Sequence, residues 1–245
     1  MSQKTKQRNL IATFIIVLSV VGIGSFLAYY FYANQTTIQI TTQECEDIEI
    51  IPQSFFDRDL LTMYNQFYPV SGEAGYFQYA YSTASGDPMI LVRPHPYPSP
   101  TSSNEIRMDL DYDSGVLTFT ANIYIYISSF LQTKNRLTVV FYSEENGQII
   151  QSFYVGVLSN AFQAYGNGSN WLQWVSGTPN RYNFAVKITI NLDNNVITSE
   201  LRNRDTGDSK TAQHSFYRNI AGVGFYTYGI DAIMDLSNVE LQYCG

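Results

Sequence analysis

Apolar and polar residues alternate with a period of two through most of this chain, and this pattern constrains its fold more than any other feature. In residues 106–111 apolar side chains alternate with Arg and Asp, and in residues 123–127 three isoleucines alternate with Tyr124 and Tyr126. A period of two places successive side chains on opposite faces of a β-strand. The pattern therefore predicts strands from residue 36 onward.

Turn signals divide this region into about ten to twelve short strands. The pair Asn146-Gly147 lies between two apolar runs, which is the strongest short hairpin signal. Residues 55–66 are the only helical candidate in this region, one or two turns long. The 20 Tyr and 15 Phe supply enough apolar volume for a core. We therefore expect an all-β fold in which two antiparallel sheets pack face to face.

An uncharged apolar run occupies residues 10–33. As a helix, these 24 residues would be about 36 Å long, enough to span a hydrocarbon core of about 30 Å. A cleaved signal peptide is the alternative, but Phe31 and Ala33 before Asn34 match a small-x-small cleavage site poorly. The run predicts a retained N-terminal transmembrane helix that acts as a signal-anchor.

Charge around this run predicts its orientation. No acidic residue precedes it, and three basic residues do: Lys4, Lys6 and Arg8. Because Lys and Arg stay on the cytoplasmic side, the bulk of the chain is expected outside, on a cell or virion surface. The predicted organisation is a cytoplasmic tail (1–9), a transmembrane helix (10–33), a stalk (34–44) and an extracellular β-sandwich domain (45–245).

The two cysteines, Cys45 and Cys244, lie near the two ends of the predicted outer domain. An oxidising compartment permits a disulfide that would join its first strand to its last; two unpaired thiols are the alternative. Asn34 and Asn167 each begin an N-glycosylation sequon. A net charge of −7 argues against a nucleic-acid partner.

Several predicted strands have an aliphatic or Phe face and an opposite face rich in Tyr. A tyrosine ring packs on the C–H face of a sugar and its hydroxyl forms hydrogen bonds, so the Tyr face is a candidate glycan-binding platform. An ordinary half-buried sheet surface is the alternative, because Tyr is a good strand former. The candidate ligand-binding residues are Tyr124, Tyr126, Tyr154, Trp171, Trp174, Tyr226 and Tyr228.

A weak calcium candidate lies at Asp109, Asp111 and Asp113, where carboxylates occupy alternate positions before Gly115. The simpler interpretation is a strand whose acidic side chains face solvent before a turn. No other cofactor is expected, and the distant Cys and His residues form no metal-ligand pattern.

Two segments resemble concanavalin A-like (laminin-G-like) jelly rolls. Residues 182–193 with 196–202 resemble a strand pair of that superfamily, and residues 220–228 with 234–241 resemble its last two strands. The resemblance covers residues 70–245 and implies a two-sheet jelly roll whose first and last strands are neighbours, which fits a Cys45–Cys244 bridge. The superfamily includes lectins, adhesion modules, glycosidases, lyases and structural domains, so the fold does not select a function.

Enzymatic motifs match poorly. Residues 44–49 depart from a jelly-roll glycosidase signature at Glu46, and residues 199–202 carry only part of an alginate-lyase motif. We therefore expect a non-catalytic, membrane-anchored recognition or adhesion module whose partner is a glycan or another surface protein. A structural surface subunit that self-associates into a homo-oligomer is the first alternative, and a glycan-processing enzyme is the second.

Overall fold

A computed structural model describes residues 44–52, 66–71, 76–82, 86–93, 103–130, 134–166, 169–175 and 180–245. The chain divides into two units, Met1–Thr42 and Gln43–Gly245, and the described residues belong to the second. The predicted tail, transmembrane helix and stalk lie outside the described residues except for Glu44, as does nearly all of the predicted short helix. Among the described residues there is no helix long and apolar enough to cross a bilayer.

The described part of the chain forms fifteen strands in two antiparallel sheets, which confirms the all-β two-sheet prediction. Sheet A contains, in spatial order, β13 (Ser209–Ser215), β12 (Val196–Asn203), β11 (Arg181–Asn191), β6 (Val116–Phe130), β15 (Ile230–Cys244), β4 (Pro88–Arg93) and β3 (Tyr76–Tyr81), with β1 (Cys45–Asp47) beside β15. Sheet B contains β10 (Ser169–Val175), β9 (Ala161–Gly166), β8 (Gln148–Leu158), β7 (Arg136–Glu145), β14 (Ile220–Tyr228), β5 (Ser103–Tyr112) and β2 (Tyr68–Ser71).

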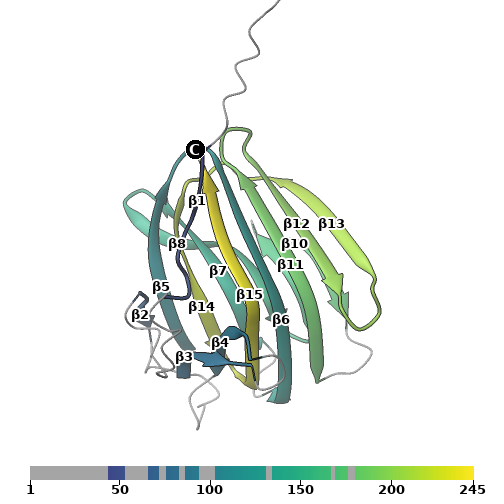
Figure 1. The fold of residues 1–245 in the computed structure, drawn as a ribbon. Coiled ribbons are helices and arrows are strands. Elements are labelled where there is room, and N and C mark those ends of the chain that lie inside the picture. Colours follow the sequence, from purple (N-terminus) through teal and green to yellow (C-terminus); the bar gives the residue numbers. More distant parts are fainter. Residues whose placement is uncertain are drawn as a thin grey trace, which may run out of the picture. The chain divides into compact units, whose positions relative to one another are not determined.

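The predicted hairpin joins β7 to β8. Asn146 and Gly147 have φ angles of 54° and 75°, the left-handed conformation that a two-residue hairpin turn requires. Strands pair mostly with partners distant in sequence: β6 lies between β11 and β15, and β14 lies between β7 and β5. In Figure 1 the long strands β6 and β15 run side by side along sheet A.

The core lies between the two sheets. In β6 every second residue from Leu117 to Ile127 is buried and points inward. Rings from opposite sheets meet there: Phe162 stacks on Phe184 with centroids 4.2 Å apart, and Phe119 meets Phe141 edge-on at 5.7 Å. The period-two pattern of the sequence thus becomes the inner face of each sheet.

Strand β7 departs from this alternation, because residues 137–143 are all buried. Leu137, Val139 and Phe141 face the core, so Thr138 and Tyr142 must be covered on the outer face of sheet B. If water alone covered this face, Thr138 and Tyr142 would be accessible to solvent. Longer side chains from neighbouring strands therefore cover the middle of this face.

The predicted disulfide is present between Cys45 and Cys244. These residues face each other in the register of β1 and β15, and Glu46 and Asp47 continue that pairing. Figure 1 shows β1 beside the end of β15, next to the C-terminus. The bridge therefore joins the first described strand to the last, as predicted.

Replacing both cysteines by alanine should lower the free energy of unfolding. The bridge spans a sequence separation of 199 residues, and the chain-entropy model gives an upper value of about 5 kcal/mol for a loop of that length. Urea unfolding of the full chain should show a lower midpoint, with a steeper slope because the unfolded chain without the bridge is more expanded. The same midpoint for C45A/C244A and the oxidised wild type would contradict this prediction.

Candidate functional site

The outer face of sheet B carries a row of side chains that crosses the strands. In the strand register, Tyr226 on β14 pairs with Glu105 on β5 and with Thr138 on β7. The row continues from Thr138 to Gly156 on β8 and then to Gln163 on β9. Because Phe225 and Val139 point into the core, their sequence neighbours Tyr226 and Thr138 point outward. One row thus brings residues from five strands onto the outer face.

Arg136, at the start of β7, lies at the centre of this face. Its guanidinium lies over the rings of Tyr154 and Tyr226, 3.9 Å and 4.4 Å from their centroids. Both distances fit cation–π contacts. Burial lowers the pKa of Arg136, and four nearby groups oppose that shift: Tyr154, Tyr226, Tyr142 and Glu105. Because a guanidinium ordinarily titrates far above neutral pH, Arg136 remains a cation.

Two of the three Arg136 nitrogens have hydrogen-bond acceptors. Nη1 donates to Oε1 of Gln151 at 2.7 Å, and Nε donates to Oγ1 of Thr138 at 3.1 Å. Nη2 is buried and has no hydrogen-bond partner among the described residues. A buried charged donor without an acceptor lowers the folding stability by about 1 to several kcal/mol. An acceptor from outside the protein would remove this cost.

Glu105 places a negative charge beside this cation. Its residue is only 8% exposed, and its Oε1 accepts hydrogen bonds from Tyr142 Oη at 2.7 Å and from Gln151 Nε2 at 2.6 Å. Gln151 therefore links the carboxylate to the guanidinium, since its amide donates to one and accepts from the other. Burial and the Glu105 charge raise the pKa of Tyr142, which keeps its hydroxyl protonated as a donor.

Arg107 on β5 is a second cation on the same face. Its guanidinium lies 5.4 Å from the ring centroid of Tyr142 and 5.1 Å from that of Tyr68. Its Nε donates to Oδ1 of Asp109 at 2.9 Å and to Oη of Tyr68 at 2.7 Å. Arg107 is thus held by its own partners, in contrast to Arg136.

Gly224 on β14 lies where this strand closely approaches the backbone of β5. It pairs with Arg107 on one side and with Val140 on the other. A Cβ atom at Gly224 would lie 2.0 Å from the carbonyl oxygen of Ile106, so no larger residue fits without moving the backbone. The close approach of β14 and β5 therefore requires glycine here.

Tyr154 and Tyr165 extend the cluster toward β9. Their rings stack with centroids 4.8 Å apart, and burial raises the pKa of Tyr154 to about 12. Nearby, Gln163 donates through Nε2 to the Leu158 carbonyl oxygen at 3.1 Å, while its buried Oε1 has no partner among the described residues. The face thus presents an unpaired acceptor as well as an unpaired donor.

The predicted tyrosine platform does not form one continuous face, and that prediction was wrong. Tyr154, Tyr226 and Tyr228 lie on sheet B, whereas Tyr124 and Tyr126 lie on β6 in the middle of sheet A. Alternation tells which residues point outward, but it does not tell which sheet a strand joins. In a two-layer sandwich the two outer faces point in opposite directions.

Trp171 and Trp174 lie in β10 at the edge of sheet B, and their side chains are outside the described part of the structure. Sequence patterns did not identify the residues that anchor the sheet B cluster: Glu105, Arg107, Arg136, Tyr142 and Gln151. The charged residues of β5 were interpreted as a solvated strand face. The one usable signal was the run of four consecutive apolar residues at 139–142 in β7, which departs from the alternation of its neighbours.

The three carboxylates of the weak calcium candidate do not converge on one point. Asp109 accepts from Arg107 and Tyr68, while Asp111 and Asp113 are exposed at the end of β5 and in the turn after it. The described residues include no group of three or more His, Cys, Asp or Glu side chains placed to hold a metal ion. Asn34 and Asn167, which begin the sequons, lie outside the described residues.

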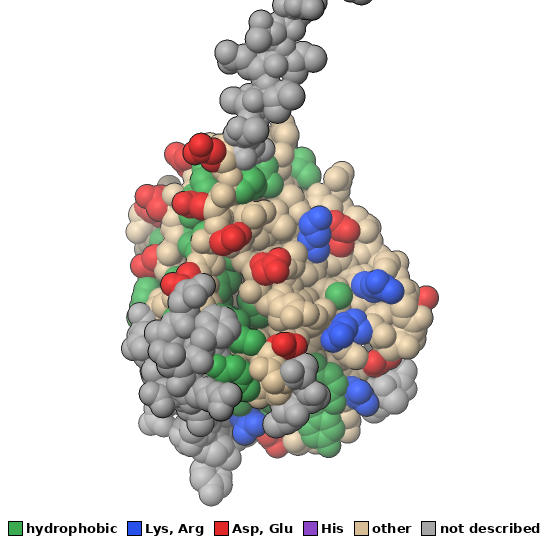
Figure 2. Space-filling model, viewed as in Figure 1, with side chains coloured by type: hydrophobic (Ala, Val, Ile, Leu, Met, Phe, Trp, Pro, Cys, Tyr) green, Lys and Arg blue, Asp and Glu red, His purple; other side chains and the backbone are tan. Residues whose placement is uncertain are grey.

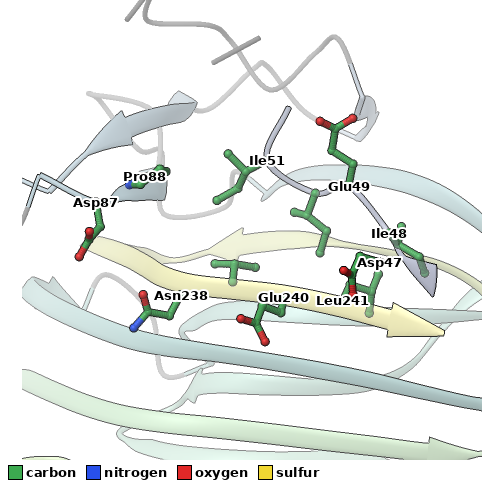
Figure 3. A pocket seen from close by; sticks show the side chains of 11 residues that line it. Asp47, Ile48, Glu49, Ile51, Asp87, Pro88, Asn238, Glu240 and Leu241 are labelled. Carbon is green, nitrogen blue, oxygen red and sulfur yellow. The ribbon is translucent and has the colours of Figure 1, made fainter. Parts of the chain in front are cut away.

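A groove of about 700 Å³ lies beside β15 on sheet A, between the segment that follows β1 and the start of β4. Figure 3 shows Asp87 facing Asn238 at one end and Glu49 pointing away at the other. Ile51 and Pro88 lie between these polar groups. The acidic side chains therefore do not converge on a common point, and we do not treat this groove as the functional site.

No protein-family model matches the sequence, and no curated protein sequence matches it significantly. Among solved structures, the chain resembles a Bauhinia forficata lectin in complex with GalNAc, with a TM-score of 0.50 and 8% identity over 82% of this chain and 98% of the lectin. The winged bean acidic lectin complexed with methyl-α-D-galactose gives a TM-score of 0.49 and 10% identity over 82% and 98%.

The alginate lyase AlgAT5 of polysaccharide lyase family 7 is similar at a TM-score of 0.46, with 11% identity over 74% of this chain and 96% of the lyase. Identities this low carry no information on activity. The likeness to the Bauhinia lectin concerns the fold, and it confirms the predicted concanavalin A-like jelly roll.

Replacing Tyr142 by Phe should destabilise the protein by about 2 kcal/mol, because it removes a buried donor from the Glu105 carboxylate. Tyr217→Phe is the matched control, since Tyr217 is 76% exposed and should change stability by less than about 0.5 kcal/mol. Urea unfolding of both variants measures the difference. Equal stability of the two variants would show that the Tyr142–Glu105 hydrogen bond is not formed.

Proposed function

We propose that this protein is a non-catalytic carbohydrate-recognition module that binds an acidic glycan on the outer face of sheet B. The observation that carries the proposal is Arg136, held between Tyr154 and Tyr226 with its Nη2 buried and unpartnered. A carboxylate or sulfate of a glycan would supply the missing acceptor after a small movement of the covering side chains exposes Nη2, which is buried in the free chain.

The neighbouring groups suit the rest of a sugar ring. Tyr154 and Tyr226 are half-buried, so part of each ring remains as apolar surface for sugar C–H groups. The unpaired Oε1 of Gln163 would accept a hydrogen bond from a sugar hydroxyl. Since Gln151, Thr138 and the two rings already fix Arg136, little side-chain entropy remains to be lost on binding.

The non-catalytic part of the proposal follows from the same contacts. Glycosidic cleavage by the usual route needs two carboxyl groups across the sugar bond. Glu105 already accepts from Tyr142 and Gln151. Burial raises the pKa of both Tyr154 and Tyr226 above the ordinary phenol value, so neither phenol is a ready base at neutral pH.

The proposed location is a membrane surface, with the jelly roll outside. It is supported by the apolar run at residues 10–33, by the basic residues before it and by a disulfide that needs an oxidising compartment. Full-length protein should stay with membranes after an alkaline wash, and added protease should reach the jelly roll on intact cells. Release by the wash would contradict the anchor.

Replacing Arg136 by Gln should weaken acidic-glycan binding at least tenfold, because a charge-assisted hydrogen bond is lost. The assay is binding of the full chain in detergent to a panel of uronate-bearing, sulfated and neutral oligosaccharides. Arg202→Gln, an exposed change on sheet A, is the control, and thermal melting verifies that each variant is folded.

Three outcomes would contradict the proposal. The first is the absence of any acidic glycan among the hits of the folded wild type. The second is undiminished binding by folded R136Q. The third is a steady loss of chain length in the bound polysaccharide that Glu105→Gln abolishes, which would instead make the protein an enzyme. Assembly of the chain with rising concentration and no glycan would favour a structural role.

A further inference from the structure

A second cluster of aromatic and polar side chains lies on the outer face of sheet A. On β6, Tyr126 pairs with Arg181 of β11 and with Ile233 of β15. One step along, Tyr124 pairs with Asn183 and Asp235. All of these residues are out of phase with the buried Ile123, Ile125 and Ile127, so they point away from the core.

The two tyrosines are presented differently. The Arg181 guanidinium lies 5.2 Å from the ring centroid of Tyr124 and holds that ring against the sheet. Tyr126 is 48% exposed, more than any other large hydrophobic side chain whose exposure is described within a strand. An exposed ring on the outer face of a sheet is a surface on which a sugar can pack.

Asp235, beside Tyr124, supplies the second observation. Its Oδ1 is buried and has no hydrogen-bond partner among the described residues. Burial raises the pKa of this carboxyl, and the charge of Arg93 on the adjacent strand β4 opposes that shift. A buried carboxylate oxygen without a donor is costly unless a bound molecule supplies the hydrogen.

The character of the unpaired atom distinguishes this site from the one on sheet B. At Arg136 the unpaired atom is a donor, which calls for an acceptor such as a carboxylate or sulfate. At Asp235 it is an acceptor, which needs a hydrogen-bond donor such as a sugar hydroxyl. Figure 2 shows both Lys or Arg and Asp or Glu side chains on the visible face. A neutral sugar, with hydroxyl donors and an apolar ring face, fits this chemistry.

We infer that Tyr124, Tyr126 and Asp235 form a second carbohydrate site, specific for a neutral sugar, on the face opposite the Arg136 site. The sugar packs on Tyr126 and its hydroxyls donate to Asp235. This inference rests on the proposed function for its ligand class. Since the two outer faces point in opposite directions, one chain can hold a neutral and an acidic glycan together without forming an oligomer.

The test compares variants of the full chain in detergent on a panel of neutral and acidic oligosaccharides. Tyr126→Ala and Asp235→Ala should weaken the neutral hits at least tenfold and leave the acidic hits unchanged, while R136Q should do the reverse. Tyr217→Ala, at an exposed tyrosine outside the strands, is the control. The wild type should also link beads coated with a neutral hit to beads coated with an acidic hit. Each of the three variants Y126A, D235A and R136Q should abolish this linking.

Neutral hits that survive Y126A and D235A, or a panel without neutral hits, would overturn the second site and leave the Arg136 site standing. Neutral hits that are lost in Y126A, together with acidic hits that are unchanged in R136Q, would instead support the second site and overturn the first. If Y126A alters sedimentation of the chain and no glycan binding, a second copy covers this face and the inference fails.

Stability provides a readout that needs no ligand. Because the folded-state pKa of Asp235 is raised, the ionised form weakens folding above that pKa and the penalty disappears as the pH falls below it. Asp235→Asn should therefore raise the Tm by about 2 °C at pH 7 and by less at pH 4. Arg93 and Tyr124 are the titratable groups beside it. A lower Tm for D235N at pH 7 would show that Oδ1 has an internal donor and would remove the basis of the site.

Discussion

The structure depends on the burial of one face of each sheet, and β6 shows this constraint most clearly. Its residues alternate strictly between core and outer face from Leu117 to Ile127, and it pairs with both β11 and β15. A shift of one residue in that pairing would expose the isoleucines and bury the tyrosines. Once this register is fixed, β11 and β15 are fixed as well, and the disulfide ties β1 to the C-terminal end of β15.

The packing of the inner faces does not determine the residues on the two outer faces, and these residues differ between the sheets. The outer face of sheet B holds a buried network in which Gln151 connects Glu105 to Arg136, with Arg136 enclosed by two tyrosine rings. A network of this kind contributes less to stability than apolar residues of the same volume would. Its unpaired Nη2 is the observation that supports the proposed binding role.

The sequence predicts the strands better than it predicts the site. Alternation indicated β5, β6, β11, β12, β14 and β15, the Asn146-Gly147 turn indicated the β7–β8 hairpin, and the cysteine positions indicated the bridge. Alternation failed to predict which residues share a face, because that depends on pairing between strands distant in sequence. Tyr126 and Tyr154 look equivalent in sequence but lie on opposite faces. Arg136 and Glu105 gain their partners only through the β5–β14–β7–β8 order. The anchor at residues 10–33 stays a prediction.

The most direct test of the Arg136 site is an NMR titration of the full chain in detergent with ¹⁵N-labelled arginine. The Arg136 Nε–H group, which donates to Thr138, should give a resolved signal in the free protein. Addition of a uronate tetrasaccharide and, separately, of a sulfated one should shift this signal saturably with at least one of them, while Arg202 on sheet A stays unchanged. An Arg136 signal that stays unchanged at saturating concentrations of both would contradict the account.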